Sequence, residues 1–221
     1  MWLDRREGDF YTRPPAMKKY TDLTLEKYLD ELASAEPVPG GGSVSAYTAA
    51  LAMALTQMVG RIALARKKKS GMRPAEEEKD AENRATIEKI ITSLEKTRRD
   101  AFQIVNLDPR VYGEVVKASG HPEKMEDALQ DSFRLQADLA FLIVMAREWN
   151  SNMAGLVSGS IKNDLLVSAG LLEGAFHGAC HTAMINVKYM KDPAQKGRSE
   201  AALQELKKRF QKENTGAGQR S

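Results

Sequence analysis

The chain has 221 residues, 42% of them apolar, and a formal net charge of +3. This length fits one domain, or one domain with short tails, and the apolar content is sufficient for a hydrophobic core. A single cysteine, Cys180, excludes an internal disulfide and fits a reducing compartment.

We expect the N-terminal segment, residues 1–20, to be an irregular extension, because it is rich in charge and contains Pro14-Pro15. It lacks the apolar region of a signal peptide, and no uninterrupted apolar run in the chain reaches membrane length. These features predict a cytoplasmic protein that does not bind membranes. The folded domain should cover residues 21–213, with a flexible tail at 214–221.

A short helix is predicted after Thr24, which can serve as its N-cap. Its apolar stripe has helical spacing and consists of Leu25, Tyr28, Leu29 and Leu32. The helix should end at a loop with the sequence Pro37-Val38-Pro39-Gly40-Gly41-Gly42-Ser43, called here the Pro/Gly loop. An alanine-rich second helix is then predicted from about Ser43 to Lys68.

The Pro/Gly loop has two interpretations. It is either a tight turn between helices in which Ser43 is the N-cap, or a ligand-binding loop that offers backbone N–H groups at a helix start. It is not a phosphate-binding P-loop, because no Gly-Lys-Ser/Thr follows it and no strand precedes it.

The third helix is predicted to begin near Ala75 and to carry an inner stripe that ends at an aspartate: Ile87, Ile91, Leu94, Arg98, Ala101, Val105 and Asp108. Pro109 is expected to interrupt it. Asp108 then has two interpretations. It caps a new helix as part of an Asp-Pro pair, or it is a functional carboxylate, since an acid on an apolar face is costly unless paired or used.

Further helices are predicted from about Glu123 to Trp149, from Lys162 to Met190 and from Ser199 to Glu213. Gly170, Gly174 and Gly178 form a smooth stripe on the second of these, which permits close packing against another helix. No segment has a strong strand pattern. We therefore predict an all-α, single-domain bundle of about six to seven helices.

Two chemical features are judged structural. His177, Cys180 and His181 share a helical face, but no second cluster supplies further zinc ligands, so we predict no metal site. The run Arg66-Lys67-Lys68-Lys69 is typical of a solvated helix end, and no aromatic residues interleave with it. We therefore expect no binding of nucleic acid.

Four segments resemble the cyclodeaminase/cyclohydrolase family of folate one-carbon metabolism, over roughly residues 21–193. The first is the opening helix 24–33, and the most specific is Pro39-Gly40-Gly41-Gly42-Ser43 with the alanine-rich helix and Met58-Val59. The third is the pattern Asp108, Tyr112, Val115 and Val116. The fourth spans residues 160–192 and includes Asp164, Gly174, Asn186, Val187 and Lys188. Two features depart from the family pattern: Pro109, and the absence of a Leu-Pro-Lys feature in segment 121–131.

The resemblance implies an all-helical fold, a homodimer and a reduced folate as ligand. The favoured activity converts 5-formimidoyltetrahydrofolate to 5,10-methenyltetrahydrofolate with release of ammonia. The alternatives are a methenyltetrahydrofolate cyclohydrolase and a non-catalytic folate-binding or scaffold protein. The chemistry calls for proton transfers but for no metal, covalent nucleophile or cofactor beyond tetrahydrofolate. A formiminotransferase would be the companion protein.

At the matching positions, the resemblance assigns catalytic roles to Asp108 and Asp164. It assigns substrate binding to the remaining matched polar or flexible positions: Gly40, Gly41, Gly42, Ser43, Tyr112 and Asn186. Alternatively, Asp164 only stabilises the start of its helix and Tyr112 only packs. Asp164 and Asn186 lie about 33 Å apart on one helix, so an unbroken helix allows them to share a pocket only across two subunits.

Overall fold

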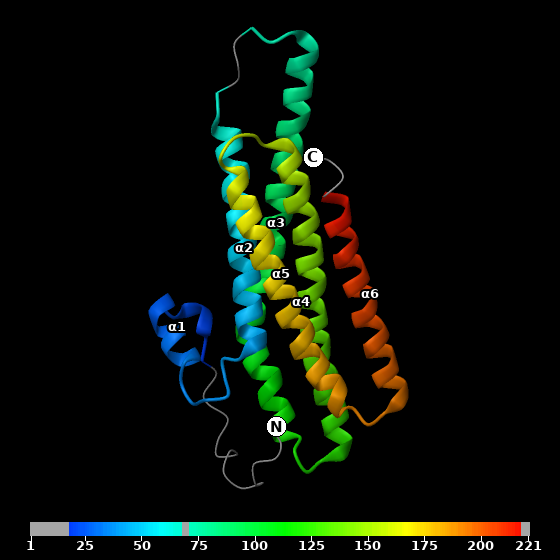
Figure 1. Cartoon of the computed structure of the whole chain (residues 1–221). Coiled ribbons are helices and arrows are strands. Elements are labelled where there is room, and N and C mark those ends of the chain that lie inside the picture. The colour runs from blue at the N-terminus through cyan, green and yellow to red at the C-terminus, as the bar shows by residue number, and fades with distance from the viewer. Residues whose placement is uncertain (1–17, 68–70, 218–221) are drawn as a thin grey trace.

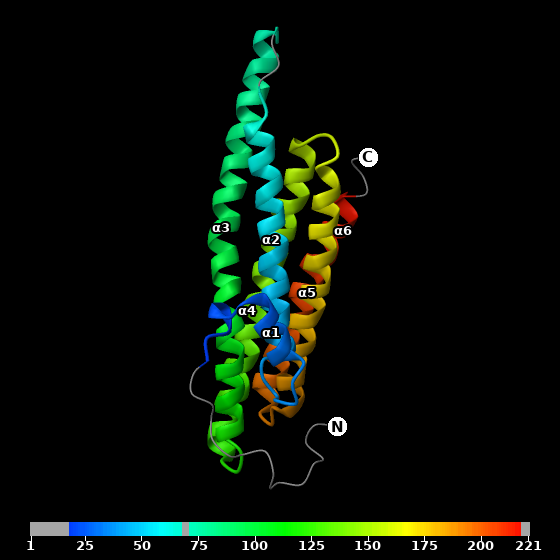
Figure 2. The same ribbon diagram turned by 90° about the vertical axis from the view of Figure 1, so that its left-hand side faces the viewer.

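The computed structural model describes residues 18–67 and 71–217, and within these residues it contains helices and no strand. Four long helices form an antiparallel up-and-down bundle (Figure 1): α2 (Gly41–Ala65), α3 (Pro74–Lys117), α4 (Pro122–Leu156) and α5 (Lys162–Tyr189). α6 (Pro193–Ala217) packs mainly against α4. The short helix α1 (Leu25–Leu32) lies beside the start of α2 (Figure 2), and η1 (Tyr20–Asp22) packs against α3. The expected all-helical fold is confirmed.

The outer boundaries differ in detail from those expected. Tyr20 is buried in η1, so the ordered domain includes the last residue assigned to the irregular extension. α6 continues to Ala217, past the expected start of the flexible tail at residue 214. Residues 1–17 of the expected extension and 218–221 of the expected tail lie outside the described residues.

α1 begins where its capping residue predicts, because the Thr24 hydroxyl accepts a hydrogen bond from the Lys27 N–H at 3.3 Å. Its predicted apolar stripe is only partly buried: Tyr28 stacks on Tyr47 with ring centroids 5.0 Å apart, whereas Leu25 and Leu29 are exposed. The helix therefore rests on the bundle through Tyr28 and the partly buried Leu32.

α2 is the central helix, and its small side chains let α3 and α5 approach closely. Ala46, Ala49 and Ala52 are completely buried. By length and composition α2 is also the one helix among the described residues that could span a membrane, although polar residues such as Thr56 and Gln57 interrupt its apolar sequence. Its polar side chains are nevertheless paired inside the bundle: Thr56 is hydrogen-bonded to Asn150 of α4 and Ser168 of α5, both at 2.8 Å. In this structure α2 is a core helix.

α3 runs unbroken through Pro109, so the predicted interruption at that residue is wrong. The helix is about 66 Å long at 1.5 Å per residue, and its N-terminal turns extend beyond the other helices in both views (Figures 1 and 2). At the opposite end of the bundle, α3 and α4 continue past the start of α2. The first turn of α2 therefore lies beside α3 and α4.

Candidate functional site

Asp108 lies at the first turn of α2, where three helices meet. Its Oδ2 accepts a hydrogen bond from the Ser43 backbone N–H at 3.0 Å, and its Oδ1 accepts one from Gln136 Nε2 of α4 at 2.7 Å. The N–H groups in the first turn of a helix have no partner within the helix. Asp108 supplies such a partner from α3, so it does not cap its own helix as the Asp-Pro interpretation proposed.

Ser43 is also not the N-cap of α2. That position is Gly40, whose side chain can make no capping bond, and Ser43 lies inside the first turn. Its hydroxyl donates instead to the backbone carbonyl of Val105 at 3.0 Å. Because a serine hydroxyl has one proton, the 3.1 Å contact between the Tyr28 hydroxyl and Ser43 Oγ is donated by Tyr28.

Pro109 explains why the Val105 carbonyl is open to this bond. In an α-helix the N–H of residue 109 would bond to the carbonyl of residue 105, but proline has no N–H. The Ser43 hydroxyl takes that place, so the proline leaves room for a hydrogen bond that ties α2 to α3. This tie lies one turn before Asp108 on α3.

Gly42 is fixed by the same cluster. A Cβ atom at this position would overlap Asp108 Oδ1 and Gln136 Nε2. Any larger residue would separate α2 from the carboxyl group that its first turn binds. The glycine therefore permits the close approach itself, which agrees with its place in the Pro/Gly loop.

Asp108 is 8% exposed, and burial raises its pKa to about 6 from an ordinary value of 3.8. The hydrogen bonds from Ser43 and Gln136 favour the ionised form and oppose this rise. A carboxyl group with a pKa close to neutral can both accept and donate a proton during a reaction. The site is therefore suited to general acid–base chemistry.

Two members of the cluster were missed by the sequence analysis. Tyr28 was assigned to an apolar stripe, and its hydroxyl has no local sequence signal. Gln136 had one, because it stands at helical spacing among buried apolar residues of α4: Leu129, Phe133, Ala140 and Ile143. A fully buried glutamine in such a stripe indicates a buried polar partner.

The other predicted binding residues lie around this cluster. Gly41 lies next to Thr182 of α5, and Asn186 is buried one turn further along, with its Nδ2 donating to the Thr182 carbonyl at 3.0 Å. Tyr112 is 41% exposed and follows Asp108 by one turn on α3. These positions, with Gly40, are near the start of α2.

Asp164 does not join this cluster within one chain. Asp164 lies one turn before Ser168 on α5, and Ser168 is hydrogen-bonded to Thr56 of α2. Thr56 is thirteen residues after Ser43, which is about 20 Å along the α2 axis. α5 is continuous, so Asp164 and Asn186 are at opposite ends of the bundle. A shared site for Asp108 and Asp164 would need a second copy of the chain.

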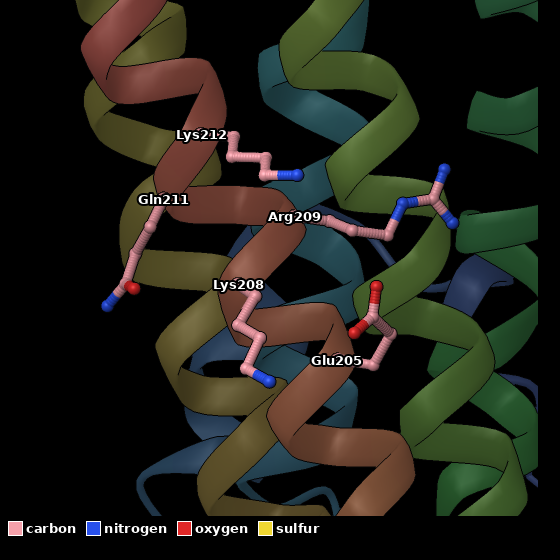
Figure 3. A pocket seen from close by; sticks show the side chains of 5 residues that line it. All are labelled: Glu205, Lys208, Arg209, Gln211 and Lys212. Carbon is pink, nitrogen blue, oxygen red and sulfur yellow. The ribbon is translucent and has the colours of Figure 1, made fainter.

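The surface also has hollows lined by other residues. A shallow hollow is lined by five residues of α6 alone: Glu205, Lys208, Arg209, Gln211 and Lys212 (Figure 3). It combines solvated charges with no side chain from a second element. Among the described residues, no group of three or more His, Cys, Asp or Glu side chains is placed to hold a metal ion.

The fold and the Asp108 cluster define an all-helical bundle protein with a buried carboxyl group suited to proton transfer. A family model described as formiminotransferase-cyclodeaminase matches residues 24–205. The chain belongs to this family.

Individual proteins of known name are similar at lower identity. The formimidoyltransferase-cyclodeaminase of Sus scrofa is 29% identical over 198 residues, which cover 83% of this chain and 35% of that protein. The methenyltetrahydrofolate cyclohydrolase of Methylorubrum extorquens is 23% identical over 171 residues, 74% of this chain and 77% of that protein. This chain therefore spans about a third of the length of the transferase-cyclodeaminase and most of the length of the cyclohydrolase.

A solved structure has the same fold. The crystal structure of formiminotetrahydrofolate cyclodeaminase from Thermotoga maritima superimposes with a TM-score of 0.79 and 22% sequence identity. The match covers 90% of this chain and 96% of that one. The likeness therefore extends over nearly the whole helical bundle.

Proposed function

We propose that the chain is a folate one-carbon enzyme that converts 5-formimidoyltetrahydrofolate to 5,10-methenyltetrahydrofolate and releases ammonia. The observation that carries this proposal is the buried Asp108 carboxyl, held at the start of α2 with a pKa of about 6. Family membership supplies the class of substrate. No metal or cofactor besides the folate is part of the proposal.

The proposed reaction needs proton transfer at two nitrogen atoms. N10 attacks the formimidoyl carbon, so a C–N10 bond forms, and the bond to the formimidoyl nitrogen breaks as ammonia leaves. N10 must lose a proton and the departing nitrogen must gain one. Asp108 takes the proton from N10 as a carboxylate and returns it to the leaving nitrogen as a carboxylic acid.

The remaining residues near Asp108 are proposed to hold the substrate. The backbone of Gly40 and Gly41 at the positive end of α2 suits an acceptor atom of the folate. Tyr112 and Asn186 flank this end of the helix from α3 and α5. Asp164 contributes only if a partner subunit brings it to this end.

A methenyltetrahydrofolate cyclohydrolase is the second candidate. The specific observation in its favour is that this chain covers 77% of the length of the similar cyclohydrolase. In that reaction a water molecule attacks the carbon that bridges N5 and N10, and the Asp108 carboxylate accepts a proton from the water. The two activities therefore differ in the nucleophile and not in the demand placed on Asp108.

The test is a steady-state assay of the purified protein with both folates, read by the absorbance of the methenyl form. Asp108→Asn keeps the shape of the side chain and removes the titrating group, so turnover should fall by about 100-fold or more. Asp100→Asn changes an exposed acid two turns earlier on α3 and serves as the matched control. It should retain wild-type turnover.

Four outcomes are informative. Production of methenyl-folate with ammonia from the formimidoyl substrate supports the cyclodeaminase, and faster hydrolysis of the methenyl substrate supports the cyclohydrolase. Wild-type turnover by Asp108→Asn on both substrates removes Asp108 from the mechanism. Folate binding without turnover of either substrate leaves the non-catalytic scaffold.

We also propose that the protein is a homodimer that pairs through α2 and α5. Leu51, Met58 and Ile62 recur on one side of α2 and are exposed, as are Val167 and Ile185 on α5. Gly170 and Gly174 have no atoms within 4 Å of the position of a Cβ. A second copy would cover this surface, called here the α2/α5 face.

The cellular setting follows from the proposed activity. The names of the transferase relatives combine two activities, and this chain matches 35% of the length of the Sus scrofa protein. A formiminotransferase is proposed as the partner that supplies the formimidoyl substrate, and the cytoplasm as the compartment. Purified formiminotransferase and this chain should together form methenyl-folate from formiminoglutamate and tetrahydrofolate.

A further inference from the structure

Gln136 is fully buried and only half satisfied. Its Nε2 donates to Asp108 Oδ1 at 2.7 Å, whereas its Oε1 is a buried acceptor with no hydrogen-bond partner. Buried acceptors are normally paired, and leaving one unpaired is destabilising. The unpaired Oε1 and the Nε2 that donates to Asp108 Oδ1 therefore belong to the same amide group.

We propose that Gln136 is a positioning residue whose amide group reverses as Asp108 gains and loses a proton. When Asp108 is ionised, Gln136 Nε2 donates to it. When Oδ1 carries the proton, two donors would oppose each other, and a half-turn of the amide brings Oε1 to accept from the carboxyl group. The inference rests on the proposed function, in which Asp108 moves a proton.

The groups that shift the Asp108 pKa besides burial are the Ser43 backbone N–H and the Gln136 amide, and neither is charged. α1 contributes the titratable group Tyr28, which faces Asp108 through Ser43, while α2 contributes the Ser43 N–H and α4 contributes Gln136. Burial is the largest influence on the Asp108 pKa, and the Gln136 hydrogen bond lowers it. On α3 itself, Arg110 is exposed and Tyr112 lies one turn away.

The consequence is that both protonation states of Asp108 are hydrogen-bonded while the helices stay in place. Ser43 holds Oδ2 in the ionised state and Gln136 serves Oδ1 in either state. A fixed donor at the Gln136 position would favour the carboxylate of Asp108 and lower its pKa, so the group would be a weaker base and would seldom carry a proton near neutral pH. The reversible amide therefore lets one carboxyl group serve as base and then as acid.

The direct test is nuclear magnetic resonance of the substrate-free protein between pH 4.5 and 8. The side-chain amide signals of Gln136 should titrate with the same midpoint as the Asp108 carboxyl carbon, and the titration should vanish in Asp108→Asn. Gln136 signals that do not change while Asp108 titrates overturn the proposal. This measurement needs no Gln136 variant, so it decides the matter even if such a variant does not fold.

Gln136→Met supplies the second test, because methionine fills similar space and cannot donate the hydrogen bond. The Asp108 midpoint should rise by about one pH unit, and the acid limb of kcat/KM should move to higher pH by the same amount. Gln57→Met, which changes another buried glutamine paired with Arg98, is the matched control and should leave the midpoint unchanged. An unchanged midpoint in Gln136→Met would mean a merely structural role.

The two proposals fail in different ways. If Asp108→Asn turns over both folates normally while the Gln136 amide titrates with Asp108, the proposed function falls and the coupled pair stands. If Asp108→Asn is inactive and the Gln136 signals do not titrate, the inference about Gln136 is wrong and the proposed function stands.

Discussion

Asp108 combines a role in packing with an electrostatic penalty. Its oxygens bind a backbone N–H of α2 and the side chain of Gln136, and these bonds join three helices. Burial nevertheless raises its pKa to about 6, so the ionised form is less favourable in the folded protein than in the unfolded chain. Such a group is expected where function requires a tuned proton affinity.

The penalty predicts a pH-dependent effect of Asp108→Asn on stability. Because the folded pKa is raised, the stabilisation from the protonated group is complete below about pH 4 and is lost as the pH rises through about 6. A rise from 3.8 to about 6 corresponds to roughly 3 kcal/mol. Asp108→Asn should therefore be more stable than wild type above pH 7, by up to this amount, and similar to it near pH 4.

Urea denaturation of both proteins across this range measures the difference. The prediction concerns how the difference in unfolding free energy changes with pH, because a difference that is the same at every pH has other causes. A free energy of unfolding for Asp108→Asn that lies below wild type by the same amount at every pH would contradict it. The expected gain at neutral pH, together with lost turnover, would be a trade of stability for activity.

At the scale of the helices, a broken local rule is compensated by a contact from elsewhere. Hydrophobic periodicity predicts the five longer helices and the inward direction of Asp108, and Thr24 predicts the start of α1. The expectation drawn from Pro109 alone is wrong, because α3 continues through this residue. The Ser43 hydroxyl that binds the free carbonyl comes from 62 residues away, so no local pattern could reveal it.

The tie between Ser43 and Val105 can be tested with Pro109→Ala. Ser43→Ala alone leaves the buried Val105 carbonyl unpaired and should cost about 1–3 kcal/mol. In the Pro109→Ala protein, the new N–H of residue 109 can bond to that carbonyl, so Ser43→Ala should cost at least about 1 kcal/mol less. Urea denaturation of the wild type, the two single variants and the double variant gives the coupling energy between positions 43 and 109.

Ser45→Ala is the matched control for the cycle. The Ser45 hydroxyl donates to the Gly41 carbonyl of its own helix at 2.7 Å, so its removal should have the same effect with proline or alanine at position 109. Additive effects of Ser43→Ala and Pro109→Ala would show that Pro109 does not create the need for the serine hydroxyl.

For the whole molecule, the site depends on which end of the bundle each residue occupies. Periodicity places residues on a face of a helix but does not say which helices adjoin. The sequence therefore pointed to Asp108 and the Pro/Gly loop separately, and the fold joins them. It could not pair Gln136 with Asp108, because that contact depends on the register between α3 and α4. Asp164, matched by resemblance, lies at the far end of α5.

A homodimer through the α2/α5 face would change this last placement. Gly174 lies close to the midpoint between Asp164 and Asn186 on α5. Two α5 helices that cross near Gly174 in nearly antiparallel directions bring the Asp164 end of one copy to the Asn186 end of the other. The bare backbone at Gly170 and Gly174 would allow such an approach.

Gly174→Leu tests the homodimer without disturbing the monomer. No atom lies within 4 Å of a Cβ at position 174, so leucine fits the isolated bundle but should overpack an interface by about 1–3 kcal/mol. Gly155→Leu on α4, where a Cβ also meets nothing, is the matched control. Sedimentation velocity should find a dimer for wild type and Gly155→Leu, and a shift toward monomer for Gly174→Leu with unchanged helical circular dichroism. Dimers of equal strength in all three proteins would place the interface elsewhere, and Asp164 would then lack a route to the site.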